Sequence, residues 1–375
     1  MRIILTGGGT AGHVNPALAI AEDFRKNLPN TEILFFGTKN GMEKALVSAA
    51  GYAYFEIEAM GLSRSLSLKN LRALWLAYAS PRKARRLLFE LNPDLVVGTG
   101  GYVCWPVLSA AASLGLPTAV HESNAIPGLT VRRLARRVDL VLLNFSEAAA
   151  CLPSSAKTLH VGNPLRSGFS SITREEARRR LGIPGEARLT VSFGGSLGAA
   201  AINEAVLDVF EGYTLKDGSA YHIHSAGSRY IEEMKEKIKK RFGALPKRIE
   251  VREYLHEMPT LMAAADLLIC RAGAMTVTEL ALSRRAAILI PSPNVANDHQ
   301  TKNAEALATL GGALLVRESE LQKTELAEQV RALLYDDKRR CAMEQAAKEF
   351  GFPDANRRVY AALLKLMKAK GKGRR

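Results

Sequence analysis

Three glycine-rich turns each follow an apolar run and precede an amphipathic stretch, which is the order of a strand, a tight turn and a helix. They read TGGGTAGH (residues 6–13), GTGGYVCWP (98–106) and FGGSLGAAA (193–201). Glycine lets a backbone approach an anion closely, and the helix that follows offers free N–H groups and a positive dipole end. Such turns at the carboxyl ends of parallel strands would line a crevice, so the sequence predicts binding of polyanionic ligands.

The first turn fits the pattern G-x-G-x-x-G through Gly7, Gly9 and Gly12. A dinucleotide site would also need an acid at the end of the second strand, where the chain reads FGT at 36–38. A phosphate-loop nucleotidase would need a lysine after the last glycine, where the chain reads GHV at 12–14. Both classes are therefore disfavoured, and a turn that only packs is the alternative to an anion site.

The third turn also fits G-x-S-x-G, the nucleophile elbow of serine hydrolases, with Ser196 as the nucleophile. The acid and the histidine of a triad are available downstream in the required order, as Asp266 or Asp298 followed by His299. A serine hydrolase is therefore a remote alternative. It leaves the other two glycine turns without a role.

Two stretches in the second half place polar residues at predicted helix starts. In CRAGAMTVTELA (270–281), Glu279 lies near the beginning of a helix, where its carboxylate could accept hydrogen bonds from a sugar diol. A glutamate that only complements the helix dipole is the alternative. In NDHQTKNA (297–304), Asp298, His299 and Gln300 open another helix, where they would also suit a helix cap or an exposed surface.

Apolar runs alternate with amphipathic stretches through all 375 residues, which predicts an α/β fold with parallel sheets. Buried strands are expected at Ile3–Leu5, Ile33–Phe36, Leu95–Val97, Thr118–Val120, Leu140–Leu143, Leu189–Phe193, Leu267–Cys270 and Ala287–Ile290. The series stops near residues 162–164 and starts again with the third glycine turn. We therefore predict two Rossmann-like domains, 1–163 and 164–355, followed by a helix and basic tail at 356–375 that could return to the first domain.

The chain carries 52 lysines and arginines against 37 acids, a net charge of +15. Such a field attracts nucleic acid, anionic lipid or anionic substrates. No acid occurs between Glu58 and Glu90, where leucines and Trp75 are interleaved with basic residues: Arg64, Lys69, Arg72, Arg82, Lys83, Arg85 and Arg86. Nucleic-acid binding is not expected, because aromatic residues make up only 6% and no nucleic-acid motif interrupts the α/β pattern.

Other features of the sequence exclude further classes. No run approaches the roughly 20 apolar residues of a membrane span, and the strand expected directly after Met1 leaves no room for a signal peptide. The four cysteines are far apart without ligand spacing, so neither a disulfide framework nor a zinc site is expected.

Seven motifs, in this order, give the chain a resemblance to one family over nearly its whole length: GGGTAGHVNPALAIA, GGYVCWP, HESNAIPGL, GNPLRSGF, FGGSLGAAAINE, CRAGAMTVTELA and NDHQTKNA. The chain resembles the glycosyltransferases that transfer N-acetylglucosamine from UDP-N-acetylglucosamine (UDP-GlcNAc) to undecaprenyl-pyrophosphoryl-N-acetylmuramoyl-pentapeptide (lipid I), forming lipid II for peptidoglycan synthesis. The resemblance implies the GT-B fold, with two Rossmann-like domains facing a cleft, and an inverting transfer to a C4 hydroxyl. Another GT-B transferase of UDP-sugars with a different acceptor is the alternative.

The resemblance also implies positions for both substrates. The second domain of this family holds UDP-GlcNAc, with the uracil by Tyr254 and Leu255, the ribose on Glu279 and the sugar hydroxyls on Gln300. Contacts to the donor diphosphate are implied for Arg166, Ser196, Ala274, Met275 and Thr276. Contacts to the donor sugar from the first domain are implied for Thr10, Ala11, Gly12 and Asn124. The acceptor pyrophosphate is implied to face Gly9, Gly100, Gly101 and Tyr102.

An inverting transfer needs a base, and a positioned base contributes about 10²- to 10⁴-fold to the rate. His13 leads, because a helix N-terminus lowers the pKa of an imidazole and favours its neutral form. Glu122 competes with it, and a His13 that only orients substrate is a further alternative. No Asp-x-Asp motif occurs, so Mg²⁺ is not indicated and no cofactor is expected to be required. Ala11 stands where the family usually has glycine, so the first turn would differ if this position needed a positive φ.

A lipid acceptor gives the basic segment Arg64–Arg86 a role at an anionic membrane surface. Each basic residue near such a surface contributes about 1 kcal/mol, and leucines and Trp75 would enter the interface. A solvated helix face with one buried stripe is the alternative. The resemblance therefore implies a peripheral protein on the cytoplasmic face of the cell (inner) membrane, and it leaves room for other cell-wall synthesis proteins as partners.

Overall fold

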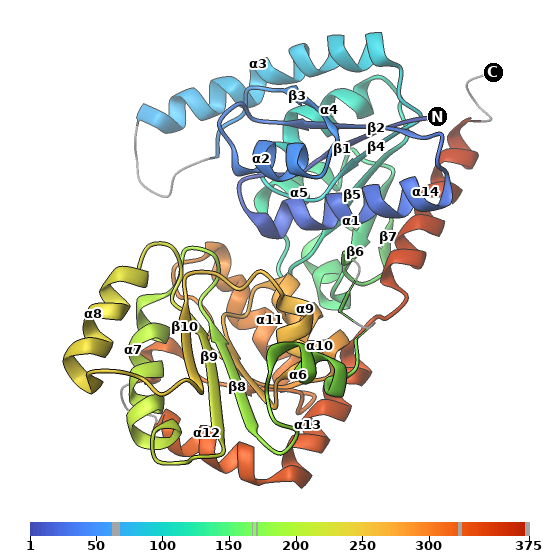
Figure 1. Cartoon of the computed structure of the whole chain (residues 1–375). Coiled ribbons are helices and arrows are strands. Elements are labelled where there is room, and N and C mark those ends of the chain that lie inside the picture. The colour runs from blue at the N-terminus through green and yellow to red at the C-terminus, as the bar shows by residue number, and fades with distance from the viewer. Residues whose placement is uncertain (62–67, 167, 170–171, 322–324, 372–375) are drawn as a thin grey trace. The chain divides into compact units, whose positions relative to one another are not determined.

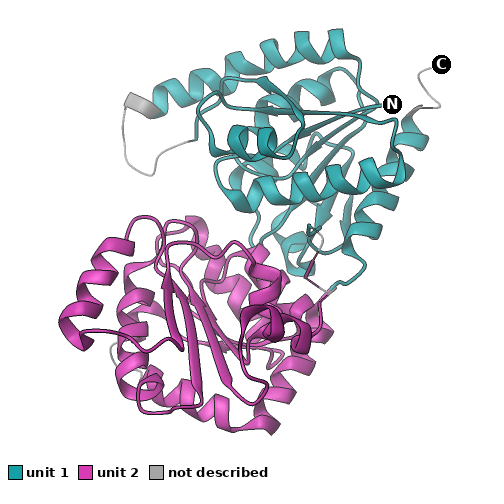
Figure 2. Cartoon of the chain, in the orientation of Figure 1, with its two compact units in different colours: residues 1–166, 352–375 teal, residues 167–351 magenta. Residues whose placement is uncertain are grey.

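The computed structural model describes residues 1–61, 68–166, 168–169, 172–321 and 325–371. The chain forms two compact units, shown in Figure 2: unit 1 comprises residues 1–166 and 352–375, and unit 2 comprises residues 167–351. Each unit is built on one sheet in which all the strands run parallel (Figure 1). The predicted α/β class with two Rossmann-like domains is confirmed.

The unit boundaries fall a few residues away from those expected from the sequence. Residues 164–166 and 352–355, which we placed with the second domain, lie in unit 1. The side chain of Asn356 explains the difference at the first boundary, where the chain passes from unit 1 to unit 2. Leu165 N donates to Asn356 Oδ1 and Asn356 Nδ2 donates to Leu165 O, both at 2.9 Å. These two bonds fasten the backbone of Leu165 to the end of the chain, a contact between residues 191 positions apart.

Unit 1 carries a seven-stranded sheet in the order β3-β2-β1-β4-β5-β6-β7. Its strands are β1 (Arg2–Thr6), β2 (Glu32–Gly37), β3 (Ala53–Glu56), β4 (Leu95–Gly98), β5 (Thr118–Glu122), β6 (Leu140–Leu143) and β7 (Thr158–His160). Its helices are α1 (Ala11–Asn27), α2 (Met42–Ala49), α3 (Leu68–Leu91), α4 (Cys104–Ser113), α5 (Leu129–Leu134), the 3-10 helix Ser146–Cys151 and α14 (Ala355–Gly371).

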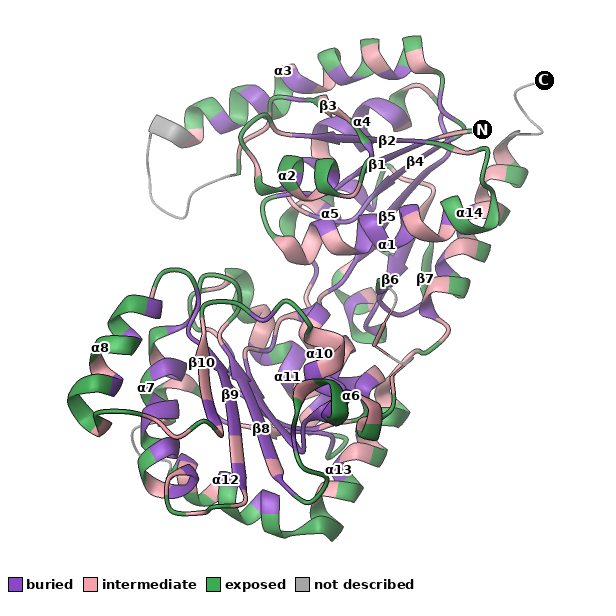
Figure 3. Cartoon of the chain, viewed as in Figure 1, coloured by how far each residue is buried: buried purple, intermediate pink, exposed green. Residues whose placement is uncertain are grey.

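Helices cover both faces of this sheet. One buried cluster joins the strands to α1, α2 and α14, and another joins them to α3, α4 and α5. Helix α14 packs along α1, with the rings of Phe24 and Tyr360 4.9 Å apart. The central strands are buried on both sides, as Figure 3 shows, because hydrophobic residues such as Ile3, Ile4 and Leu5 occupy consecutive positions. The C-terminal helix is therefore part of the first unit.

Unit 2 carries a six-stranded sheet in the order β10-β9-β8-β11-β12-β13. Its strands are β8 (Arg188–Phe193), β9 (Ala220–Ser225), β10 (Ile249–Arg252), β11 (Leu267–Cys270), β12 (Ala286–Leu289) and β13 (Leu314–Leu315). Its α-helices are α6 (Arg174–Leu181), α7 (Ala200–Val209), α8 (Ile231–Phe242), α9 (Met258–Ala264), α10 (Ala274–Ser283), α11 (His299–Ala308), α12 (Leu326–Tyr335) and α13 (Asp337–Phe350).

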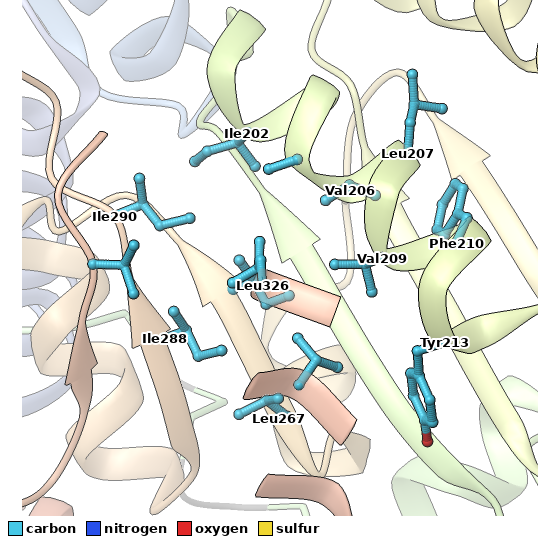
Figure 4. Packing of buried hydrophobic residues seen from close by; sticks show 14 of the residues in the cluster. Ile202, Val206, Leu207, Val209, Phe210, Tyr213, Leu267, Ile288, Ile290 and Leu326 are labelled. Atoms are coloured by element: carbon cyan, nitrogen blue, oxygen red, sulfur yellow. The ribbon is translucent and has the colours of Figure 1, made fainter. Parts of the chain in front are cut away.

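Short helical turns complete unit 2, at Phe210–Thr214, Ala296–Asp298 and Glu318–Glu320. The core on one face of its sheet is shown in Figure 4, where Ile202, Val206 and Val209 of α7 meet Ile288 and Leu326. The three residues of α7 repeat at a spacing of three to four, which places them on one face of the helix. The helix thereby fixes the turn that precedes it against the end of β8.

Candidate functional site

The strand order of unit 1 reverses direction between β1 and β4, and Thr6 pairs with Gly98 in register. The first and second glycine turns therefore leave the sheet side by side, at the point where open α/β sheets bind ligands. Hydrogen bonds join them: Gly8 N donates to Gly100 O (3.4 Å) and Thr99 Oγ1 donates to His13 O (2.6 Å). The two turns form one packed surface.

Three glycines make this packing feasible because each has a positive φ and a close neighbour. A Cβ on Gly100 (φ +107°) would lie 2.5 Å from Nδ1 of His13. On Gly9 (φ +85°), it would lie 3.1 Å from the ring of Tyr102, and on Gly101 (φ +83°) it would collide with the backbone of the first turn. Unit 1 thus brings together the predicted base His13 and the four residues predicted to face the acceptor pyrophosphate.

Helix α1 begins at Ala11, with Thr10 as an extended N-cap residue (φ −148°). The first N–H groups of a helix have no partner within it, so those of Ala11 and Gly12 are suited to an anion or a sugar oxygen. Ala11 is helical, and the positive φ of this turn falls on Gly9. The alanine in place of the usual glycine therefore requires no change in the turn.

Glu122, the competing base, ends strand β5 and is buried. Its Oε1 accepts from Asn124 N (2.9 Å) and Asn124 Nδ2 (3.0 Å), and its Oε2 accepts from Gly128 N (2.9 Å). Burial raises the pKa of Glu122, partly offset by these hydrogen bonds. The carboxylate therefore braces the loop after β5 through both of its oxygens.

Two further residues of unit 1 are tied into the structure. His121 is fully buried, and its Nε2 bonds Gly162 O (2.9 Å). Burial lowers the pKa of His121 to about 4, so the ring is neutral. Arg166, predicted to contact the donor diphosphate, pairs with Glu22 of α1 (2.7 Å). That pair is largely exposed, and exposed pairs of this kind contribute about 0–1 kcal/mol.

The strand order of unit 2 reverses between β8 and β11, where Phe193 pairs with Cys270. The third glycine turn and the turn before α10 therefore start next to each other, as the two turns of unit 1 do. A Cβ on Gly198 (φ +84°) would collide with the carbonyl of Ala226. Ser196 is exposed at the tip of its turn, and its carbonyl accepts from Ser228 N (3.2 Å).

A buried chain of hydrogen bonds lies beside the third turn. Ser192 Oγ bonds His222 Nε2 (2.7 Å) and His224 Nδ1 (2.8 Å). His224 Nε2 bonds Asn203 Oδ1 (3.1 Å), and Asn203 Nδ2 donates to Ala226 O (3.0 Å). Burial lowers the pKa of His224 to about 3 and that of His222 well below its usual value, so both rings are neutral. This chain of hydrogen bonds ends on the carbonyl of Ala226, against which the third turn packs at Gly198.

Acid is expected to destabilise unit 2 through these histidines. Between its depressed folded pKa and about 6.5, a buried histidine binds fewer protons folded than unfolded, so its contribution to stability is lost as pH falls below 6.5. Replacing His224 by glutamine removes one such group. The stability advantage of wild type over H224Q should shrink by up to about 1.4 kcal/mol per pH unit between roughly 6.5 and 4.5. Urea unfolding measures this difference, and a constant advantage would show that His224 is not held neutral.

Helix α10 presents most of the residues predicted for the donor. It begins after Gly273, with Ala274 and Met275 buried and Thr276 half-buried. Glu279 is its sixth residue, beyond the first turn, so the alternative of a first-turn glutamate complementing the dipole is wrong. Burial raises the pKa of Glu279 to about 7. A half-buried carboxylate with this pKa suits a partner that supplies hydrogen-bond donors.

The remaining donor residues follow strands β10 and β12: Tyr254 and Leu255 lie on the loop after β10, and Gln300 is the second residue of α11. Tyr254 is exposed with its ring against His256 (4.9 Å), while the side chain of Leu255 is buried. Gln300 accepts from Ser292 N through Oε1 (2.9 Å), which holds the loop between β12 and α11. Asn303 is buried there and donates to Ala272 O (3.2 Å). Gln300 and Asn303 therefore position the loop, and the amide NH₂ of Gln300 is the group suited to a sugar hydroxyl.

Sequence reasoning missed one strained feature of that loop. Asn297 (φ 54°) and Asp298 (φ 49°) are consecutive non-glycine residues with a left-handed backbone. Strain of this kind costs energy and gathers at functional sites. The sequence does carry a signal for this conformation, because asparagine and aspartate tolerate a left-handed backbone better than other non-glycine residues.

The structure gives the serine-hydrolase alternative no support. The positive φ angles of the third turn fall on Gly195 and Gly198, not on Ser196. His299, the predicted triad histidine, bonds Ala296 O (2.8 Å) within its own loop. His222 and His224 do bond a serine hydroxyl, but it is that of Ser192, inside the sheet. Within the described segments, no three histidine, cysteine or acidic side chains are grouped as metal ligands would be.

Comparison with known proteins identifies the family to which these motifs belong. The model of the glycosyltransferase family 28 N-terminal domain matches residues 3–143, and that of the C-terminal domain matches residues 190–359. The chain is 41% identical over 374 residues to the UDP-N-acetylglucosamine--N-acetylmuramyl-(pentapeptide) pyrophosphoryl-undecaprenol N-acetylglucosamine transferase of Acetivibrio thermocellus, covering 100% of both chains. It is 40% identical over 377 residues to the transferase of the same name from Desulforudis audaxviator, again covering 100% of both.

Solved structures agree. The crystal structure of Acinetobacter baumannii MurG has a TM-score of 0.76 and 28% identity, covering 97% of this chain and 99% of that one. The UDP-GlcNAc 2-epimerase of Neisseria meningitidis has a TM-score of 0.68 at 14% identity, covering 97% of this chain and 100% of that one, a likeness of fold alone. The GT-B class is confirmed. The chain belongs to glycosyltransferase family 28 and, within it, to the family of the UDP-N-acetylglucosamine--N-acetylmuramyl-(pentapeptide) pyrophosphoryl-undecaprenol N-acetylglucosamine transferases.

Proposed function

We propose that this chain transfers N-acetylglucosamine from UDP-GlcNAc to the C4 hydroxyl of the muramoyl sugar of lipid I, forming lipid II with inversion at the anomeric carbon. The observation that carries the proposal is identity of about two residues in five with transferases of this name over the whole chain. The glycine turns at the switch point of each sheet support it, because they suit the diphosphate of the donor and the pyrophosphate of the acceptor.

In unit 2, the donor is proposed to bind along the carboxyl ends of β8, β10, β11 and β12. Glu279 accepts hydrogen bonds from the ribose hydroxyls, and the start of α10 donates N–H groups to the diphosphate. Ser196 and the dipoles of α7 and α10 stabilise the negative charge that develops on departing UDP. The proposal requires no metal, because these protein groups supply the stabilisation of the charge on UDP.

In unit 1, the acceptor pyrophosphate is proposed to face the second glycine turn and Tyr102, with His13 removing the proton of the attacking hydroxyl. The ring of His13 packs on Gly100, which fixes the imidazole at the meeting point of both turns. A base needs a neutral imidazole, and the positive end of a helix dipole favours that form. The side chains predicted to touch the donor from unit 1, those of Thr10, Asn124 and Arg166, remain predictions within this scheme.

Helix α3 is proposed to contact an anionic membrane surface. Its buried stripe consists of Ala73, Leu76, Ser80, Ala84 and Leu88, whereas large apolar side chains are exposed: Leu71, Leu74, Trp75, Tyr78 and Phe89. Arg72, Arg82, Lys83, Arg85 and Arg86 are exposed among them, while Arg64 and the side chain of Lys69 lie outside the described residues. The exposure of Trp75 (63%) and Tyr78 (70%) next to these basic residues favours a membrane-contacting face over a merely solvated one. Within the described parts of the chain, no helix combines the length and hydropathy needed to cross a bilayer.

The double substitution W75S/Y78S is expected to weaken binding to vesicles containing anionic lipid by about tenfold or more. Inserting a large apolar side chain into the interface contributes roughly 1.5–3 kcal/mol, and both contributions would be lost. L310S, which alters an exposed leucine of unit 2, is the matched control and should leave binding within about twofold. Sedimentation with vesicles measures both, and equal binding by wild type and W75S/Y78S would contradict the role of α3.

The proposed function is tested by a panel of donors and acceptors. Labelled UDP-GlcNAc is incubated with a lipid I analogue, with a lipid-free control and with other UDP-sugars, in the presence and absence of EDTA. Transfer that needs both UDP-GlcNAc and lipid I, and that survives EDTA, supports the proposal. Transfer to a different acceptor would favour another GT-B reaction, and labelling of Ser196 by a fluorophosphonate would favour a hydrolase.

A further inference from the structure

A buried carboxylate lies beneath the first glycine turn, in a place that the turn motif itself does not reveal. Glu43 is the second residue of α2 and is 1% exposed. Its Oε1 accepts from Thr38 N (3.0 Å) and Thr38 Oγ1 (2.6 Å), and its Oε2 accepts from Gly9 N (3.4 Å). The neighbouring Lys44 pairs with Glu56 (2.8 Å). The charge of Glu43 is stabilised by the N–H groups of Thr38 and Gly9 and by the hydroxyl of Thr38.

Three glycines from separate segments make room for this carboxylate. A Cβ on Gly8 would lie 2.8 Å from Cδ of Glu43, and one on Gly37 would lie 2.8 Å from its Cγ. A Cβ on Gly41, just before α2, would collide with the carboxylate. The first glycine turn, the end of β2 and the start of α2 therefore all meet at this side chain.

Glu43 is held in its charged form. Burial raises the pKa of Glu43, but the hydrogen bonds from Thr38 and Gly9 outweigh it and leave the pKa below its usual value. Tyr54 adds to the enclosure by donating to Thr38 O (2.8 Å), which fixes the residue that bonds the carboxylate most closely. A charged acceptor of this kind binds N–H groups more strongly than a neutral one.

We propose that Glu43 is a positioning residue for the acceptor end of the site. Its carboxylate takes the N–H of Gly9, which turns that group inward and sets the backbone that carries Thr10, Ala11 and Gly12 into α1. The same backbone packs against the ring of Tyr102 at Gly9 and leads directly to His13. The inference rests on the proposed function for what the turn binds, and on the structure for how the turn is held.

The substitution E43Q tests this with little change of shape. One oxygen becomes an NH₂ group that faces the N–H groups of Thr38 or Gly9, so a bond is replaced by repulsion. We expect faster amide hydrogen exchange in the segment 6–14 and a rise in the KM for a lipid I analogue of about tenfold or more. The affinity for UDP should stay within about twofold, because the nucleotide is proposed to bind in unit 2. Unchanged exchange in strands β5 and β6 shows that unit 1 of the variant is folded.

E56Q is the matched control, because Glu56 lies on the neighbouring strand and pairs at the surface with Lys44. It should leave both the exchange in 6–14 and the acceptor KM unchanged. T38V, which removes only the hydroxyl donor to Glu43, is the milder variant should E43Q fail to fold, and the same two effects are expected at smaller size.

The exchange measurement does not depend on activity, so the two proposals fail separately. If wild type transfers nothing to lipid I, the proposed function is wrong, while the exchange in 6–14 still reports on Glu43. Unchanged exchange and an unchanged acceptor KM in E43Q would overturn the positioning role. Faster exchange with an unchanged acceptor KM would overturn its link to the acceptor.

Discussion

Replacing His13 by alanine is expected to lower kcat by about 10²- to 10⁴-fold, the usual contribution of a positioned base. The imidazole packs on Gly100, where both glycine turns of unit 1 meet, and alanine leaves no group there to accept the proton of the sugar hydroxyl. The affinity for UDP should hardly change, because unit 2 carries the residues proposed for the nucleotide. The loss should therefore appear in kcat and not in the donor KM.

Steady-state kinetics with saturating donor measure this, with E122Q and H299A as comparisons. E122Q should lower stability, because the carboxylate braces Asn124 and Gly128 through hydrogen bonds. H299A should leave kcat within a few-fold. A kcat of H13A close to that of wild type, together with a collapse of kcat in a folded E122Q, would reverse the assignment of the base.

Replacing Glu279 by glutamine is expected to raise the KM for UDP-GlcNAc by about 10- to 100-fold. Hydrogen bonds to a charged group contribute roughly 1.5–3 kcal/mol, and the bond proposed here acts on the ribose in both ground and transition states. The kcat at saturating donor should therefore change little. E305Q alters a half-buried glutamate of α11 that pairs with Lys302; it is the matched control and should leave the KM unchanged.

The same carboxylate predicts a pH dependence. Burial raises the pKa of Glu279 to about 7, so in the free protein the ionised carboxylate, which accepts hydrogen bonds, is lost as pH falls below 7. The kcat/KM for the donor should fall by up to about tenfold per pH unit below that point, and E279Q should lack this component. An unchanged KM in E279Q, or the same pH profile in both proteins, would remove Glu279 from the donor site.

Most of the strands could be predicted from hydrophobic runs, and the misses have physical causes. Strand β9 was missed because His222 and His224 make AYHIHS look polar, although both are buried and paired with Ser192. The edge strands β3, β7, β10 and β13 were missed as well, because each has only two to four residues and none is fully buried, so the pattern of a buried strand is weak.

The candidate site was predictable where local pattern decides it. A glycine turn after a strand can be read from adjacent residues, and the strand order then places pairs of turns together. Glu43, Asn356 and the pairing of Arg166 with Glu22 depend on contacts between residues far apart in the chain. No local pattern carries such a contact, so these groups became visible only in the folded units.

The most direct measurement is the product formed from UDP-GlcNAc and a lipid I analogue, isolated and analysed for its linkage. The account predicts a disaccharide in which N-acetylglucosamine is joined through a β-linkage to C4 of the muramoyl sugar, formed by wild type and almost absent with H13A. An α-linkage, attachment to another hydroxyl, or no transfer by a folded protein that binds UDP would contradict it.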